Sequence, residues 1–200
     1  MNQLPRNWKR LIRPVTVGRL WVGPPWENPP AGKVCLFIEP KMAFGTGDHP
    51  TTSLCLAAVD DFLATHPRCS VLDVGTGTGV LAFAAKKLGA GRVVGTDHDP
   101  IAVELAKECA AENGLEGLEL SGKPLGAVKG KFDLVLANIL ANTLVALAPQ
   151  LAAKAKGRVV LSGVLVPQAD EVAAAFVGCG LKPVGRTVQG EWIRLDFESR

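Results

Sequence analysis

The sequence predicts an α/β fold built on a mostly parallel sheet, and three observations support this prediction. From Val71 onward, short runs of β-branched residues alternate with loops and alanine-rich stretches of helical spacing, which is typical of βαβ units. A glycine-rich turn, DVGTGTG (73–79), joins the first run to the first helical stretch, and Asp97 closes the second run. We therefore expect a Rossmann-like domain with a seven-stranded sheet, flanking helices and an antiparallel C-terminal hairpin.

The alternation of patterns assigns each element after residue 70. Helical stretches end or begin at good boundary signals: Gly89 follows one of them, Pro100 opens the next, and Asn113-Gly114 closes it. The predicted strands cover 71–74, 92–97, 118–122, 132–138 and 157–163, the predicted helices cover about 79–88, 100–114, 141–153 and 167–180, and residues 181–197 alternate like a closing hairpin.

Two further extended runs, 15–22 and 33–39, precede the first of these strands. The segment between them, GPPWENPPAG (23–32), is rich in proline, which prevents a regular element there. A helix is predicted over about 50–64. We expect residues 1–32 to form a linker-like segment with a short extended run, and residues 33–200 to form the functional domain.

Composition is that of an ordinary folded protein of one domain. The chain has 200 residues, of which 48% are hydrophobic and 20% charged, and its formal net charge is +3. Neither a signal peptide nor an apolar run long enough to cross a membrane is present, so we expect a soluble, cytoplasmic protein without a membrane partner. Basic residues gather near the N-terminus and could contact a phosphate backbone or an acidic protein, although a solvated face is favoured: Arg6, Lys9, Arg10, Arg13 and Arg19.

Cysteine and histidine spacing does not favour a metal site. The five cysteines form no CxxC pair and their number is odd, which indicates neither a disulfide framework nor a zinc cluster. The three histidines are scattered without metal-ligand spacing. No metal is therefore predicted, and a reducing cytoplasm fits this cysteine usage.

The glycine-rich turn, DVGTGTG, predicts a nucleoside site. It lies where a doubly wound sheet binds nucleotides, and Asp97 at the end of the next strand can accept hydrogen bonds from both ribose hydroxyls. A dinucleotide loop would carry a small residue three positions after Gly77, but Val80 stands there. Asp73, just before the turn, could receive an ammonium group. This combination suits S-adenosylmethionine, and the loop resembles the first motif of the class I methyltransferases, with Asp73, Gly75, Gly77 and Asp97 as candidate cofactor-binding residues.

The segment EPKMAFGTGDHPTT (39–52) supplies a second glycine-rich turn upstream of the first. Class I methyltransferases close over their cofactor with an N-terminal segment. This segment resembles it, which implies a lid. Met42 and Phe44 could then cover the adenine or the methionine stem, and Thr52 could cap the carboxylate end of the cofactor. The two glycine-rich turns would form the roof and floor of one pocket.

Several motifs together resemble the PrmA family, bacterial enzymes that methylate large-subunit ribosomal protein eleven. They are EPKMAFGTGDHPTT, VLDVGTGTGVLA (71–82), FDLVLANILANTL (132–144) and GEWIRL (190–195), with support from NWKR and VGPPWE near the N-terminus. The resemblance implies S-adenosylmethionine as cofactor, a ribosomal protein as partner, and cofactor contacts at Thr52, Gly75, Asp97 and Asn138. It also implies that this chain begins near the linker that joins the family's substrate-recognition domain to its catalytic half.

Asn138 is the main candidate for the reaction itself. Related amine methyltransferases carry Asn-Pro-Pro-aromatic at this point, and its asparagine side chain and backbone carbonyls hold the substrate nitrogen. The run here is Asn138-Ile139-Leu140-Ala141, without the aromatic residue that stacks on a flipped base, so sequence-specific nucleic-acid binding is not expected. An asparagine that only ends a strand and caps a helix is the alternative.

The resemblance implies transfer to a lysine or N-terminal amine. Such an amine, with an ordinary pKa of about 10.4 for lysine, needs desolvation and carbonyl acceptors to present its lone pair at neutral pH. Asn138 and the backbone around Ile139 are the candidates for orienting it. His49 is a candidate proton relay, with a simple hydrogen-bonding role as the alternative. Trp192 is expected in the core, with the substrate wall as the alternative.

Three functions remain open from the sequence. The favoured one is a protein-lysine or N-terminal amine methyltransferase of the PrmA type. The second is a class I methyltransferase acting on another protein or a small amine. The third is an inactive cofactor-binding module that acts as a partner protein, while an NAD-dependent dehydrogenase is a distant fourth.

Overall fold

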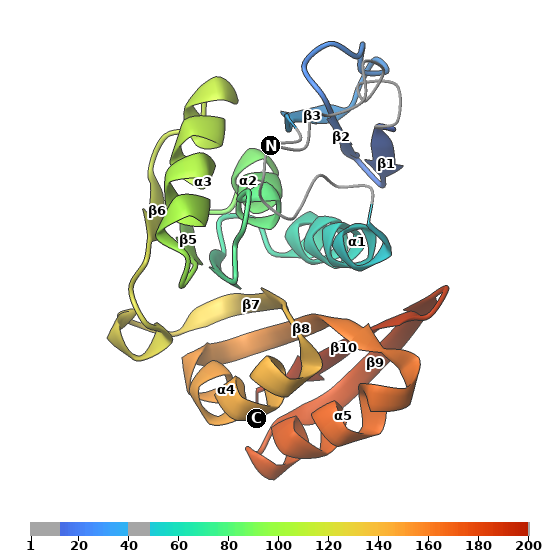
Figure 1. Ribbon diagram of the computed structural model, residues 1–200, viewed down its shortest axis with the longest axis vertical. Coiled ribbons are helices and arrows are strands. Elements are labelled where there is room, and N and C mark those ends of the chain that lie inside the picture. Colours follow the sequence, from blue (N-terminus) through green and yellow to red (C-terminus); the bar gives the residue numbers. More distant parts are fainter. Residues whose placement is uncertain (1–12, 40–48, 200) are drawn as a thin grey trace, which may run out of the picture.

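The computed structural model describes residues 13–39 and 49–199, and a seven-stranded sheet forms the centre of this part. The strand order is β6-β5-β4-β7-β8-β10-β9 (Figure 1). The strands are β4 (Ser70–Val74), β5 (Arg92–Thr96), β6 (Leu118–Ser121), β7 (Phe132–Asn138), β8 (Ala155–Leu165), β9 (Lys182–Gln189) and β10 (Trp192–Glu198). Strands β4 to β8 pair in parallel, whereas β10 is antiparallel to both β8 and β9. The predicted α/β fold with a closing antiparallel hairpin is confirmed.

Helices cover both faces of this sheet (Figure 1). One face packs against α1 (Pro50–Thr65), α2 (Val80–Lys87) and α3 (Pro100–Glu112), and the other against α4 (Ala141–Lys154) and α5 (Ala169–Gly178). Two short 3-10 turns, η2 (Leu125–Ala127) and η3 (Val166–Gln168), lie on the second side. None of the helices in the described ranges has the length and apolar character needed to cross a membrane.

The observed bounds agree with the predicted ones to within a few residues, and local chemistry explains where they differ. The helix predicted from residue 167 begins at Ala169 because residues 166–168 form η3. It ends before Gly180, whose φ of +87° stops the helix. Helix α3 begins where predicted, since the Asp99 carboxylate accepts the Ile101 amide hydrogen at 2.9 Å and Pro100 occupies the first turn.

The run predicted as one extended segment over 15–22 is wrong in the structure, because a turn divides it. Strands β1 (Val15–Val17) and β2 (Leu20–Gly23) form a hairpin, and β3 (Val34–Phe37) pairs in parallel with β2. Gly18 makes the turn with a φ of +53°, and a Cβ there would overlap the Asp60 carboxylate. Arg19 binds Asp60 through its main-chain amide at 3.0 Å and through its guanidinium, with Nε 2.6 Å from Oδ1.

This small sheet packs on the main domain. Leu20, Val22 and Leu36 belong to the same buried core as α1 and α2. Asn113, at the end of α3, holds the main chain of Phe37 from both sides: its Oδ1 accepts the amide hydrogen at 2.8 Å and its Nδ2 donates to the carbonyl at 2.7 Å. The boundary proposed between residues 32 and 33 remains a prediction.

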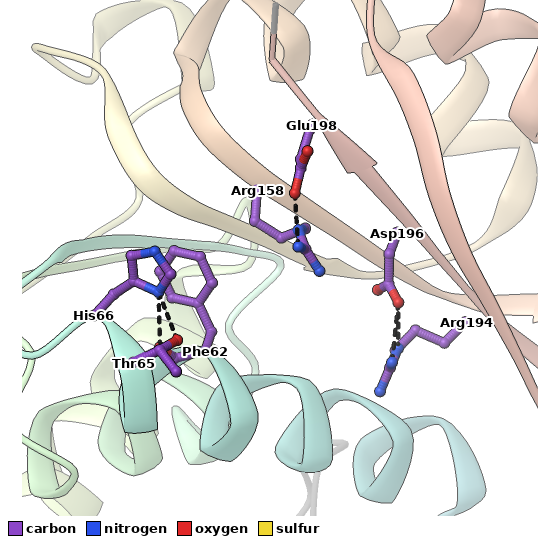
Figure 2. A network of polar contacts seen from close by, with 7 residues as sticks. All are labelled: Phe62, Thr65, His66, Arg158, Arg194, Asp196 and Glu198. Atoms are coloured by element: carbon purple, nitrogen blue, oxygen red, sulfur yellow. Dashed lines mark hydrogen bonds and ion pairs between the residues drawn. The ribbon is translucent and has the colours of Figure 1, made fainter.

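Two ion pairs lie on β8 and β10, on the side of the sheet that faces α1 (Figure 2). Arg194 on β10 pairs with Asp196 at 2.9 Å and donates a hydrogen bond to the Leu54 carbonyl of α1 at 2.9 Å. Both charged side chains are largely buried, so removing one partner would leave an uncompensated charge. Arg158 and Glu198 form a second pair at 2.7 Å on the neighbouring part of the sheet. The hydrogen bond from Arg194 ties α1 to β10, and the first turn of α1 lies at the site described next.

Candidate functional site

Two cavities lie at the carboxyl ends of the parallel strands, the place where open α/β sheets bind ligands. The large cavity, of about 600 Å³, is lined by residues that include Val74, Gly75, Thr96, Asp97, Lys123, Ile139, Leu140 and Thr143. The small cavity, of about 250 Å³, is lined by His49, Thr51, Asn138, Ile139, Leu140, Gly163 and Trp192. Ile139 and Leu140 line both, so the turn after β7 is the wall between them.

The start of the glycine-rich turn lines the large cavity through Val74 and Gly75. Gly75 and Thr76 donate their amide hydrogens to the Thr96 carbonyl at 2.8 and 3.0 Å, which ties the turn to β5. Gly75, Gly77 and Gly79 have φ angles of +73°, +54° and +88°. Only glycine adopts such angles without strain, so the sequence GxGxG is required by the shape of this turn.

Asp97 lies at the edge of the large cavity, directly after β5. Its side chain is 10% exposed. Oδ2 accepts the Gly77 amide hydrogen at 2.9 Å, and Oδ1 accepts the Asp99 amide hydrogen at 3.1 Å. Oδ1 also lies 3.3 Å from Nδ1 of the exposed His98 side chain. A carboxylate offers about four acceptor positions, so Oδ2 retains one that suits a ribose hydroxyl.

Asp73 is buried beneath the turn, and its role in the structure is to hold the turn together. Its Oδ2 accepts the Thr76 hydroxyl hydrogen at 2.7 Å and the Ala82 amide hydrogen at 3.3 Å. Burial raises the pKa of this carboxyl to about 6 and nearby Asp97 adds to the rise, while the hydrogen bonds from Thr76 and Ala82 oppose it. Asp73 does not line either cavity. Direct contact with a cofactor ammonium group remains a prediction.

Three predicted ligand-binding side chains keep a buried oxygen that lacks a hydrogen-bond partner within residues 13–39 and 49–199. They are Thr52 Oγ1, Asp73 Oδ1 and Asn138 Oδ1. Leaving such an atom unpaired costs about 1–3 kcal/mol, so a donor that reaches it would be stabilising, and of the three residues Asn138 lines a cavity. S-Adenosylmethionine carries an ammonium group and hydroxyls that can donate. The donor and acceptor chemistry of these residues therefore fits that cofactor.

Two other predicted cofactor-binding residues, Thr52 and Gly77, do not line the large cavity as Gly75 does. Thr52 lies in the first turn of α1, is 1% exposed and does not line either cavity. Gly77 contributes through its amide hydrogen bond to Asp97. Phe44, Met42 and the glycines of the predicted lid lie outside the described residues.

His49 lies in the wall of the small cavity, where it also caps α1. Its Nδ1 accepts the Thr51 amide hydrogen at 3.3 Å and lies 2.7 Å from the Thr51 hydroxyl oxygen. Because Nδ1 acts as the acceptor, the neutral ring carries its proton on Nε2. The ring meets Trp192 edge-on, with 5.0 Å between the ring centroids. This geometry favours the hydrogen-bonding alternative, and proton relay remains a prediction.

Trp192 is half-buried at the start of β10 and lines the small cavity, so the expectation of a core position is wrong. The β10 face that carries Trp192, Arg194 and Asp196 turns toward α1, whereas Ile193 and Leu195 turn into the core on the other side. The period of two along this strand could have indicated that Trp192 does not share the face of Ile193.

Sequence reasoning missed Thr51 and Gly163 as site residues. Thr51 is adjacent to the predicted Thr52 and is bonded to His49, so its place in a helix N-terminus was the available signal. Gly163 lies inside β8, and a glycine within a strand can mark a bulge or a close approach of backbones. Within the described ranges, no cluster of three or more His, Cys, Asp or Glu residues is arranged to hold a metal ion.

Comparisons with solved structures agree with this geometry. A crystal structure of ribosomal protein L11 methylase from Lactobacillus delbrueckii subsp. bulgaricus superimposes with a TM-score of 0.83 at 33% identity, covering 94% of this chain and 98% of that one. Magnesium protoporphyrin IX methyltransferase from Synechocystis PCC 6803, solved with bound SAM, matches at 20% identity and a TM-score of 0.58, over 75% of this chain and 82% of that one. The second likeness supports the class I methyltransferase fold alone.

Comparisons of sequence identify the family. A ribosomal protein L11 methyltransferase from Myxococcus xanthus is 66% identical over 194 residues, and one from Geobacter metallireducens is 47% identical over 198 residues. Each match covers 96% of this chain, and the chain spans 67% and 65% of the lengths of these relatives, respectively. The family model for ribosomal protein L11 methyltransferase (PrmA) matches residues 3–200. The predicted family is confirmed: this chain belongs to the ribosomal protein L11 methyltransferase family.

Proposed function

We propose that this chain transfers methyl groups from S-adenosylmethionine to lysine or N-terminal amines of a protein, with large-subunit ribosomal protein L11 as the first candidate substrate. The observation that carries the proposal is the pair of cavities that meet at Ile139: one has the acceptors for a nucleoside, and the other presents Asn138. The names of the relatives support the choice of substrate.

The large cavity is proposed to hold the cofactor. The Asp97 carboxylate accepts ribose hydroxyl hydrogens, and the main chain at Gly75 allows the ligand to lie against the turn. A volume of about 600 Å³ lies within the range of roughly 300–1,000 Å³ typical of small-molecule sites. When bound, S-adenosylmethionine supplies a methyl group on a sulfonium, which is already an activated leaving group.

The small cavity is proposed to hold the amine that receives the methyl group. An apolar enclosure that includes Trp192 and Ile139 disfavours the charged ammonium form and so lowers the pKa of an entering amine. The unpaired Oδ1 of Asn138 can accept an N–H of that amine, which directs the nitrogen lone pair away from Asn138. Entry from the side opposite the large cavity would place the nitrogen beside the wall at Ile139.

Within this reaction, His49 is proposed to position rather than to transfer a proton. Its Nδ1 is engaged with Thr51, and its ring supports Trp192 edge-on. The proton that the amine loses would then pass to solvent. The cytoplasm is the proposed location, and nucleic acid is not proposed as a partner.

Transfer of radiolabelled methyl groups from S-adenosylmethionine tests the proposal. Purified ribosomal protein L11 and a total cell extract serve as parallel substrates, and Asn138→Ala serves as the matched inactive variant. Label in the ribosomal protein with the wild-type chain, and none with the variant, would support the proposal. Label only in another protein or a small amine would show that this molecule, and not ribosomal protein L11, is the substrate. No label in any fraction would favour an inactive cofactor-binding module.

A further inference from the structure

The wall between the two cavities, at Ile139, is packed between two glycines. Gly75 lies on the side of the large cavity, and a Cβ added there would overlap the Cγ2 methyl group of Ile139. Gly163 lies on the side of the small cavity, and a Cβ added there would overlap the Ile139 carbonyl oxygen and lie 2.9 Å from its carbonyl carbon and 3.0 Å from its nitrogen. Gly75 therefore faces a side chain that can move, whereas Gly163 faces the main chain.

Gly163 lies at an irregularity in the sheet. On β8 and β10, Val164 pairs with Ile193 and Leu161 pairs with Leu195, so two residues of β8, Ser162 and Gly163, face one residue of β10. This is a β-bulge, and Gly163 adopts a φ of +80° within it. Bulges re-aim the chain locally and occur often beside active sites. On its other edge, β8 keeps one register with β7 from the pair Leu134 and Arg158 to the pair Asn138 and Ser162.

The bulge therefore brings a residue without a side chain against the main chain that follows Asn138. The Ile139 carbonyl occupies the space that a side chain at residue 163 would take, and both Ile139 and Gly163 line the small cavity. A carbonyl oxygen in the lining of this cavity is an acceptor that can orient an amine N–H. Its position decides whether the amine lone pair is aligned with the methyl group.

We propose that Gly163 is a positioning residue for methyl transfer: the bulge at Ser162-Gly163 sets the place of the Ile139 carbonyl, which is the second acceptor, beside Asn138, for the substrate amine. This inference rests on the proposed function. Gly163 acts through the main chain of Ile139 and itself contributes no chemical group. A shift of about 1 Å in a group that orients a reactant can cost about 100-fold in rate.

The test compares Gly163→Ala with Gly180→Ala. Both glycines have a positive φ, +80° and +87°, so both variants carry the strain of a side chain in the left-handed region. A Cβ at Gly180 has nothing within 4 Å among the described residues, and Gly180 lies after α5 outside both cavities. The pair therefore separates loss of stability from displacement of Ile139.

Three quantities are measured for each variant and for the wild-type chain: the S-adenosylmethionine Kd by calorimetry, the single-turnover transfer rate, and the chemical shift of the Ile139 carbonyl by NMR. For Gly163→Ala we expect a Kd within about twofold of wild type, a rate about 100-fold lower and a displaced carbonyl resonance. For Gly180→Ala we expect all three at the wild-type value. The double variant Gly163→Ala/Ile139→Ala should remain as slow as Gly163→Ala, because the overlap is with main-chain atoms.

Each failure has a distinct meaning. If the wild-type chain methylates no protein, the proposed function is wrong and this inference is wrong with it. If the wild type is active and Gly163→Ala retains the wild-type rate, only the positioning role is overturned. Recovery of the rate in the double variant would also overturn it, because it would show that the Ile139 side chain and not its carbonyl is displaced.

Discussion

The large and the small cavity share one wall, yet they are built from the chain in different ways. The floor of the large cavity comes from strand ends and the turns that follow them, including Gly75 and Asp97, and its polar groups already bond one another across the turn. The small cavity collects single residues from the start of α1, the end of β7, the bulge in β8 and the start of β10. A turn with a fixed shape can be encoded in a short motif, whereas a cavity assembled from four elements depends on the packing of the whole sheet.

Because of this difference, we expect substitutions in the small cavity to lower the rate of methyl transfer and substitutions in the large cavity to weaken cofactor binding. The largest effect is expected for Asn138→Ala, which removes the acceptor in the small cavity. We expect the transfer rate to fall about 100- to 1,000-fold, because the amine loses a preorganised partner. The Kd for S-adenosylmethionine should rise less than tenfold (about 1.4 kcal/mol). Single-turnover transfer and calorimetry measure the two quantities.

Asn142→Ala is the matched control for this variant, because Asn142 is an exposed asparagine in the first turn of α4 and lies outside the lining of both cavities. It should transfer at the wild-type rate. If Asn138→Ala weakened only the binding of S-adenosylmethionine and left the transfer rate unchanged, Asn138 would act in the large cavity. The two cavities would then not have separate roles.

Asp97→Ala should have the complementary effect. Its carboxylate faces the large cavity and also accepts the Gly77 amide hydrogen at 2.9 Å, so the variant loses ribose acceptors and a support of the turn. Hydrogen bonds to a charged group contribute about 1.5–3 kcal/mol, which predicts a Kd for S-adenosylmethionine about 10- to 100-fold higher. Calorimetry with the wild type, Asp97→Ala and the exposed control Asp61→Ala measures it. Equal affinities for all three would remove Asp97 from the cofactor site.

The pH dependence of stability tests whether the buried Asp73 carboxyl, which holds the glycine-rich turn, is charged. Its pKa is raised to about 6 in the folded protein, so the folded state binds the proton more tightly than the unfolded state does. The stability contributed by this group is full below pH 4 and is lost as the pH rises through about 6. Relative to Asp73→Asn, the wild type should therefore lose about 2 kcal/mol in free energy of unfolding between pH 4 and pH 7.

Urea unfolding of both proteins at pH 4, 5, 6 and 7 measures this difference. The asparagine side chain retains an oxygen that can accept the hydrogen bonds from Thr76 and Ala82, so it is a suitable comparison. A constant difference between the two proteins at every pH would show that Asp73 does not titrate in this range.

The smallest effect is expected for Trp192, which encloses the small cavity without a polar contribution to it. Trp192→Ala opens the wall beside His49 and should raise the KM for the protein substrate about tenfold, since roughly 1.4 kcal/mol of apolar contact is lost. The Kd for S-adenosylmethionine should not change. Trp192→Phe keeps an aromatic ring and should remain within about twofold of the wild-type KM. A change in cofactor affinity in either variant would contradict the separation of the two cavities.

The sequence was most informative where a local pattern has a single structural solution. The run FDLVLAN forms β7 over Phe132–Asn138 as predicted, and GxGxG forms the turn that only glycine can adopt. Prediction failed in the run 15–22, where Gly18 turns the chain with a φ of +53° and the adjacent Arg19 binds Asp60 of α1. The glycine was a local signal of a turn, whereas the pairing of Arg19 with Asp60 leaves no local signal.

The sequence by itself determined the class of fold, the glycine-rich turn, the acidic residue after β5 and Asn138 at the end of β7, because each depends on periodicity or on the φ angles of neighbouring residues. Only the tertiary structure decided that His49, Gly163 and Trp192 lie around one cavity with Asn138. These residues come from strands and helices whose neighbours are set by parallel pairing, by the bulge in β8 and by the ion pair beneath α1. The physical reason is that the direction of a side chain along a strand follows from local alternation. Which residues of separate strands and helices become neighbours is fixed only when the whole sheet packs.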